Sequence, residues 1–143
     1  MSAAADLELA RRIFETAPFM RELGVRPLAV EPGRLSTEVV IAERHLQHMG
    51  FVHAGVMASL ADHSMGAAAQ SLAPAGHWIL TAELKTSLLR AAKGRRLVCE
   101  AWVIKPGRSL SFTEAEVHAE DEAGQRTLVL KASATMAVTA PRN

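Results

Sequence analysis

The sequence predicts an α+β fold in which one long helix is wrapped by a curved antiparallel sheet. Segments 97–104, 110–119 and 127–138 have strand-like apolar patterns and are separated by short turns, which is typical of an antiparallel meander. Residues 54–72 form one long helical stretch that is rich in alanine, serine and glycine. Because such small side chains let other backbone approach closely, we expect the sheet to pack around this helix.

The first forty residues are predicted to form a helix and then a hairpin. Apolar residues recur at helical spacing over residues 4–23, although Pro18 disturbs the later part of this helix. Residues 23–42 alternate with period two on both sides of a turn at Pro32 and Gly33, as in a β-hairpin.

The long helix begins at Ala54 and is stopped by Pro74 and Gly76. Another strand is predicted at 78–88, where apolar and polar residues alternate. The turns between the later strands are marked by Gly94, Gly107 and Gly124.

The composition fits a single domain over residues 1–143, with residues 1–22 as an N-terminal helical extension. Apolar residues make up 49% of the chain and charged residues 22%, as in ordinary globular proteins. The net charge of +1 argues against a general nucleic-acid binder. The weakly charged stretch 54–80 contains Asp62, Gln70 and Pro74, so we do not expect it to span a membrane.

Two further features bear on the compartment. No basic-then-apolar run opens the sequence, so no signal peptide is predicted. The lone Cys99 cannot form an intrachain disulfide, which fits a reducing compartment. We therefore expect a cytoplasmic protein.

Asp62 is the first catalytic candidate. It is the only formally charged side chain from Ala54 to Ala73, leaving histidine aside, and its neighbours one helical turn away are small. A solvated helix face is the plain alternative, but such a face usually carries several charges, including lysines. An isolated carboxylate among small residues can act as a general base or as a nucleophile.

The start of the same helix is the second candidate. Its first N–H groups, around His53, Ala54 and Gly55, have no acceptor within the helix and can stabilise an oxyanion. Asp62 lies about 12 Å further along the axis at about 1.5 Å per residue, whereas both groups must reach one carbonyl carbon. If both take part, a second copy of the chain must supply one of them, with two helices antiparallel about a twofold axis.

Several runs of residues share their spacing with a known family. They are 47–56 (Gln-His-Met-Gly-Phe-Val-His-Ala-Gly-Val), 60–63 (Leu-Ala-Asp-His) and 66–69 (Gly-Ala-Ala-Ala), with 81–85, 88–94 and 107–110 further on. This pattern resembles the signature of the PaaI-type hot-dog-fold thioesterases. The resemblance covers about residues 20–139.

The resemblance implies a hot-dog fold that forms homodimers, commonly paired into homotetramers, and hydrolyses acyl-CoA thioesters without a cofactor. It implies that Asp62 activates water or attacks the carbonyl itself, and that the backbone N–H of Ala54 polarises that carbonyl. His53 and Gly55 would contribute to the substrate site. Gln47 would orient the water or the thioester, usually facing Asp62 of the other subunit.

Thr81 is our candidate for the hydroxyl that supports the aspartate in this family. Two positions depart from the family pattern, because many relatives have Asn in place of Gln47 and Gly in place of Ala54. Glutamine keeps the amide chemistry with a longer reach. Alanine still offers its N–H, while its methyl group crowds the carbonyl and narrows the acyl pocket.

Other features admit two interpretations each. His45, His48, His53 and His63 match no zinc spacing, so we predict no metal and regard His53 as a residue that caps or shapes the helix start. Basic turn residues either contact the phosphates of coenzyme A or are simply solvated, and our choices for phosphate contact are Arg90 and Arg108. Three methionines could line an acyl pocket, although core filling is the favoured interpretation. They are Met49, Met57 and Met65.

Two other functions stay open. An enoyl-thioester hydratase or dehydratase on the same fold would need a histidine paired with an acid, and His63 points about 100° away from Asp62 around the helix. A non-catalytic acyl-CoA-binding module would bind acyl-CoA without turnover.

Overall fold

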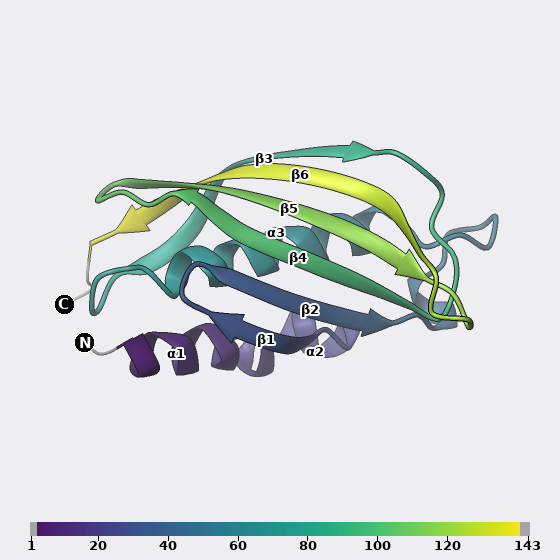
Figure 1. Ribbon diagram of the computed structural model, residues 1–143, viewed down its shortest axis with the longest axis horizontal. Coiled ribbons are helices and arrows are strands. Elements are labelled where there is room, and N and C mark those ends of the chain that lie inside the picture. Colours follow the sequence, from purple (N-terminus) through teal and green to yellow (C-terminus); the bar gives the residue numbers. More distant parts are fainter. Residues whose placement is uncertain (1–2, 141–143) are drawn as a thin grey trace.

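The structure, a computed structural model, describes residues 3–140, with side chains from residue 7 onward (Figure 1). Its helical elements are α1 (Ala3–Thr16), α2 (Pro18–Leu23), the 3-10 turn η1 (Glu43–His45) and α3 (Ala54–Gln70). Its strands are β1 (Arg26–Glu31), β2 (Arg34–Val40), β3 (Trp78–Leu88), β4 (Arg96–Lys105), β5 (Leu110–Glu120) and β6 (Arg126–Thr139). None of the helices over the described residues is both long and apolar enough to cross a membrane.

The six strands form one antiparallel sheet in the order β1-β2-β4-β5-β6-β3. The predicted hairpin is β1 and β2, and the predicted meander is β4, β5 and β6, so both predictions are confirmed. β3 does not pair with β4, which follows it in the chain. It pairs with β6 instead, from Trp78 opposite Thr139 to Leu88 opposite Leu130. As a result, β1 and β3 are the two edges of the sheet.

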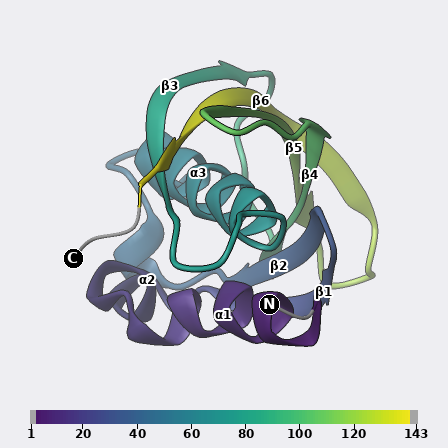
Figure 2. The same cartoon turned by 90° about the vertical axis from the view of Figure 1, so that its left-hand side faces the viewer.

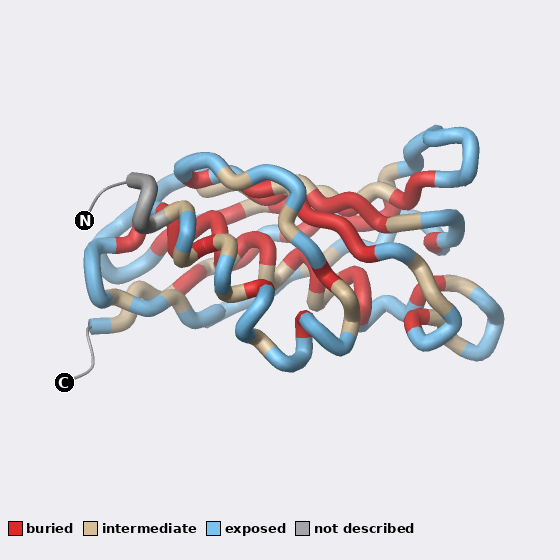
Figure 3. Tube along the Cα trace, turned by 90° about the horizontal axis from the view of Figure 1, so that it is seen from below, coloured by how far each residue is buried: buried red, intermediate tan, exposed pale blue. Residues whose placement is uncertain are grey.

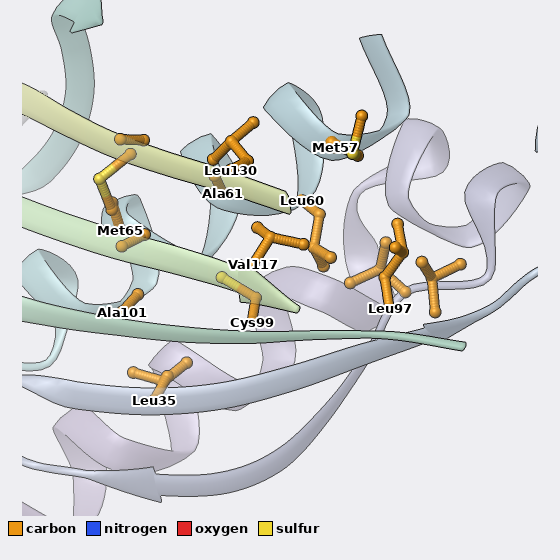
Figure 4. Packing of buried hydrophobic residues seen from close by; sticks show 14 of the residues in the cluster. Leu35, Met57, Leu60, Ala61, Met65, Leu97, Cys99, Ala101, Val117 and Leu130 are labelled. Atoms are coloured by element: carbon orange, nitrogen blue, oxygen red, sulfur yellow. The ribbon is translucent and has the colours of Figure 1, made fainter. Parts of the chain in front are cut away.

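The sheet curves around α3, as the two ribbon views show (Figures 1 and 2). α3 packs against β2, β3, β4, β5 and β6. Its small residues, such as Ala61 and Ala67, are fully buried, and so the strands lie close to the helix backbone. Leu60 and Met65 belong to the same buried cluster as Val117 of β5 (Figure 4). The predicted wrapping of the helix by the sheet is confirmed.

The predicted N-terminal helix is divided into two. α1 ends at Thr16 and α2 begins at Pro18, because proline has no N–H to donate within a helix but fits its first turn. α1 packs against both α3 and β1 (Figure 2). Ala10 and Phe14 of α1 are buried in the core. The N-terminal extension is therefore part of the packed structure.

β3 is the least buried of the long strands. Ile79 and Thr86 are half-buried and its other residues are exposed, although Leu80, Leu84 and Leu88 are apolar. Elsewhere, the buried residues gather along the middle of the molecule and the exposed ones at the turns (Figure 3). A long edge strand with exposed apolar side chains offers its unpaired backbone groups to another strand.

Ion pairs form a ladder across one end of the sheet. Arg26 of β1 pairs with Glu38 of β2, which also accepts from Arg96 of β4 at 2.8 Å. Arg96 pairs in turn with Glu120 of β5, which accepts from Arg126 of β6 at 3.0 Å. Burial opposes the ionisation of Glu38, but hydrogen bonds from the two arginines outweigh it and lower its pKa. Hydrogen bonds from Arg96 and Arg126 hold the pKa of Glu120 at about 2. The ladder links five neighbouring strands.

Candidate active site

Asp62 lies on the side of α3 that faces β3. The hydroxyl group of Thr81 donates to Asp62, with 2.7 Å between Oγ1 and Oδ1. One helical turn further on, Gly66 leaves open space, because no atom lies within 4 Å of the position that a Cβ would take there. The half-buried carboxylate is therefore oriented by the edge strand and has room beside it.

The start of α3 leaves one backbone amide free. Nδ1 of His53 accepts from the N–H of Gly55 at 2.8 Å, which confirms that His53 caps the helix. The carbonyl oxygen of His53 accepts from the N–H of Val56 at 3.0 Å. Over the described residues, the N–H of Ala54 has no acceptor. It therefore remains available, at the positive end of the helix dipole, to a ligand oxygen.

A cavity of about 480 Å³ adjoins this free amide. His53 and Ala54 form part of its wall, and Gln47 reaches it from the preceding loop. Oε1 of Gln47 accepts from the N–H of Met49, so the free end of this side chain is its NH₂ group, which can only donate. Apolar residues complete the wall, among them Phe51, Val52, Met57 and Leu88. The cavity combines hydrogen-bond donors, among them the N–H of Ala54 and the NH₂ group of Gln47, with an apolar surface.

Asp62 does not line this cavity. It lies about 12 Å beyond Ala54 along α3 at about 1.5 Å per residue. The structure thus brings the predicted residues together in two groups: Gln47, His53 and Ala54 at the cavity, and Asp62 with Thr81 beside β3. Gly55 belongs to neither group, because its N–H is occupied by the cap. Within one protomer the carboxylate and the free amide cannot reach the same carbonyl carbon.

The two arginines predicted to contact phosphate lie at opposite ends of the sheet. Arg90 follows β3, between two residues that line the cavity. Arg108 lies two residues before Leu110, the first residue of β5. Leu110 pairs with Ala137, and Ala137 pairs with Leu80 near the start of β3. In one protomer only Arg90 is next to the cavity.

The histidines lie apart and have separate contacts. His45 is buried and uses both ring nitrogens, since Nδ1 accepts from the N–H of Ala42 at 2.9 Å and Nε2 lies 2.7 Å from the carbonyl oxygen of Leu23. His63 turns toward α1, where Nε2 lies 3.2 Å from the carbonyl oxygen of Ile13, and burial lowers its pKa. Over residues 7–140, His, Cys, Asp and Glu side chains form no group of three that could hold a metal ion.

The apolar wall of the cavity was predicted only in part. Met65 is fully buried, in agreement with core filling. Met57 is 4% exposed and belongs to the core, but it also lines the cavity, as the alternative interpretation of the methionines allowed. The expectation of core filling is wrong for Met49, which is 68% exposed at the tip of a loop. Sequence reasoning missed Phe51 and Leu88, because an apolar residue in a loop or at a strand end carries no chemical signal.

Comparison with known proteins connects this geometry to a family. Residues 49–124, more than half of the chain, match the family model described as the thioesterase superfamily. The chain belongs to the thioesterase superfamily. It is a thioester hydrolase, and the hot-dog fold and the family resemblance predicted from its sequence are confirmed.

Individual thioesterases are similar over most of their length. Acyl-coenzyme A thioesterase 13 from Homo sapiens is 26% identical over 112 residues, which are 77% of this chain and 79% of the human protein. The crystal structure of a thioesterase family protein from Silicibacter pomeroyi has a TM-score of 0.89 at 31% identity, over 96% of this chain and 98% of the other. The E. coli PaaI protein, from the phenylacetic acid degradation operon, has a TM-score of 0.83 at 17% identity, over 98% of both chains. At that identity the likeness concerns the fold.

The segment that matches the thioesterase superfamily contains most of the candidate site residues. It begins at Met49 and so contains Ala54, Asp62 and Thr81, whereas Gln47 lies just before it. Helices α1 and α2 also lie outside the matched segment.

Proposed function

We propose that this thioesterase hydrolyses acyl-CoA thioesters to free acids and coenzyme A at a site shared by two copies of the chain. The observation that carries the proposal is the division of the site: the cavity with the free Ala54 amide is in one place and Asp62 in another. Hydrolysis needs a base or nucleophile and an oxyanion donor at one carbon. The name of the human relative supports coenzyme A as the thiol.

The exposed edge of β3 supports the dimer. This strand has eleven residues, its outer edge has no neighbouring strand, and its apolar Leu80, Leu84 and Leu88 are exposed. If two copies pair through β3 in antiparallel fashion, the start of one strand lies beside the end of the other. Asp62, beside β3, then approaches the cavity at the start of the partner's α3. Such pairing also removes the unpaired strand edge.

The chemistry follows from the donors and the carboxylate. In the water route, Asp62 takes a proton from water while the water oxygen attacks the thioester carbon. The oxyanion accepts hydrogen bonds from the N–H of Ala54 and from the amide of Gln47 in the other copy. The C–S bond then breaks, and the leaving thiolate takes the proton from Asp62. In the alternative route Asp62 attacks the carbon itself, and water hydrolyses the resulting anhydride.

The two routes place the oxygen of water differently. In a single turnover in H₂¹⁸O, the water route puts the label into the released acid. The anhydride route, with water attacking the Asp62 carbonyl, puts the label into the peptide that contains Asp62. Mass spectrometry of the acid and of that peptide separates the two.

Coenzyme A would extend from the shared site toward basic residues. Arg90 is adjacent to the cavity, and in the antiparallel dimer Arg108 of the second copy comes to the same end. Both are proposed phosphate contacts, because guanidinium groups bind phosphate with paired hydrogen bonds. We propose that two dimers form a homotetramer in the cytoplasm, and sedimentation velocity measures the size of the assembly.

The test of the proposed function is thiol release from a panel of acyl-CoAs by the full-length protein. We expect Asp62→Asn to lower kcat/KM by about 10²–10⁴-fold, the usual contribution of a general base. Glu122→Gln, an exposed turn residue, is the control and should leave the rate within twofold. Equal rates for Asp62→Asn and the wild type would refute the role of Asp62. Water addition to enoyl-CoA would indicate the hydratase, and binding without turnover across the panel would indicate a non-catalytic module.

A further inference from the structure

A second cavity, of about 510 Å³, lies between the N-terminal helices and β1. Its wall is formed by residues of α1, α2, β1 and the turn that joins α2 to β1, and it shares no lining residue with the cavity at the start of α3. Phe14 and Val25, which are 1% and 6% exposed, give it an apolar inner surface. The volume exceeds that of a water molecule or a single inorganic ion many times over, and it suits a small organic ligand.

Four arginines converge on this second cavity from four elements of the fold. Arg11 of α1, Arg21 of α2 and Arg26 of β1 line it directly. Arg44 of η1 reaches its rim, because its Nη2 atom lies 2.9 Å from where a Cβ would stand on the lining residue Gly24. Gly24 has a φ of +78° at the end of α2, so only glycine combines this turn with the approach of Arg44.

The positive charge of the second cavity is only partly balanced. Arg26 is paired with Glu38, a carboxylate that Arg96 also uses. Over the side chains of residues 7–140, no carboxylate lies within 4.0 Å of Arg11, Arg21 or Arg44. Glu15 is the one acidic residue in the wall. Clustering of arginines with few carboxylate partners is electrostatically unfavourable, because like charges repel.

We propose that the second cavity binds a small phosphate-bearing molecule. Guanidinium groups are the side chains best suited to a phosphate, since their planar N–H donors form paired hydrogen bonds with its oxygens. The apolar surface of Phe14 and Val25 would contact the organic part of the ligand. The phosphate belongs either to a free phosphorylated metabolite or to the nucleotide end of coenzyme A, the second of which rests on the proposed function.

The test is isothermal titration of the full-length protein with pyrophosphate at low ionic strength. We expect saturable binding that the double variant Arg11→Ala/Arg21→Ala weakens at least tenfold, in line with the loss of charge-assisted hydrogen bonds. Arg12→Ala removes an exposed guanidinium that does not line the cavity, and it should change the affinity less than twofold. Glu15→Gln should tighten binding by about threefold, because it removes a like charge at the phosphate.

Three results would overturn the proposal: no saturable binding at millimolar pyrophosphate, equal losses in Arg12→Ala and the double variant, or no gain in Glu15→Gln. Poor folding can lower the affinity for pyrophosphate but cannot raise it, so the tighter binding expected for Glu15→Gln is not explained by a folding defect. Because the titration measures no turnover, it stands or falls independently of Asp62.

Two further arms identify the source of the phosphate. If the ligand is the nucleotide end of coenzyme A, Arg21→Ala raises KM for an acyl-CoA but not for the matching acyl-pantetheine thioester. If the ligand is a free metabolite, both KM values stay unchanged and coenzyme A does not compete with pyrophosphate.

Discussion

Replacing Thr81 by valine removes one hydroxyl group from the proposed catalytic carboxylate and leaves the shape of the side chain unchanged. The lost contact is the 2.7 Å hydrogen bond to Oδ1 of Asp62. Hydrogen bonds to charged groups contribute about 1.5–3 kcal/mol in proteins. Thr81 is exposed, so water replaces part of this contact, and about 1 kcal/mol remains. We therefore expect kcat/KM to fall about fivefold.

Steady-state thiol release with one acyl-CoA measures this change. Thr81→Ser retains the hydroxyl group and should stay within twofold of the wild type, which separates hydrogen bonding from packing. Thermal unfolding and sedimentation verify that both variants fold and associate normally, since Thr81 belongs to the edge strand. Wild-type kcat/KM in Thr81→Val, or an equal loss in Thr81→Ser, would show that catalysis does not use the contact.

Three other perturbations test the fold. Burial raises the pKa of Cys99 to about 12. Native protein should therefore react with a thiol reagent at pH 8 far more slowly than unfolded protein. Fast labelling of the native protein would contradict the buried position of this thiol. The pKa of Glu120 is lowered to about 2, so its stabilising contribution is complete above the ordinary carboxyl pKa and is lost as the pH falls from about 4.5 toward 2. Urea midpoints at pH 7 and pH 3 should therefore differ less in Glu120→Gln than in the wild type. Leu60→Ala, at a fully buried site, should lower the free energy of unfolding by about 2–5 kcal/mol in urea, and a loss below 1 kcal/mol would mean that the core around α3 is loosely packed.

Local signals in the sequence account for most of the elements. The small side chains of α3 predicted close packing, and Ala61 and Ala67 are indeed covered completely. Alternation and glycine turns located the strands, because side-chain periodicity and turn geometry are properties of short segments. The break at Pro18 was visible as a disturbance, and the missing N–H explains why it became a boundary between two helices.

Contacts between residues far apart in the sequence could not be predicted from such local signals. Nothing local indicates that β3 pairs with β6, since both strands alternate and either could pair elsewhere. Gln70 is a polar residue near the end of α3, yet it is buried. Its amide donates to the carbonyl oxygen of His77 at 3.0 Å and accepts from the N–H of Ile79 at 3.2 Å. The partners of a buried amide depend on the path of a later loop.

The sequence predicted the chemical groups of the candidate site better than it predicted the residues around them. Asp62 stood out as a lone carboxylate, and helix geometry alone showed that it could not meet Ala54 within one chain. The cap by His53 followed from its position before the helix. The second cavity was not foreseen, because Arg11, Arg21 and Arg44 come together only after the helices fold against β1.

The pairing of β3 with β6 imposes an order on folding. On a ribosome, β3 emerges long before the strand that holds it in the sheet, and Trp78 must wait for Thr139 to be synthesised. Until then, neither edge of β3 has a neighbour within its own molecule, and the same leucines that would join two copies are free to meet other nascent chains. Strand pairings over such sequence separations form slowly. Correct dimer formation is therefore expected to compete with aggregation of incomplete chains. The emergence of β6 from the ribosome should be the step that decides between the two outcomes.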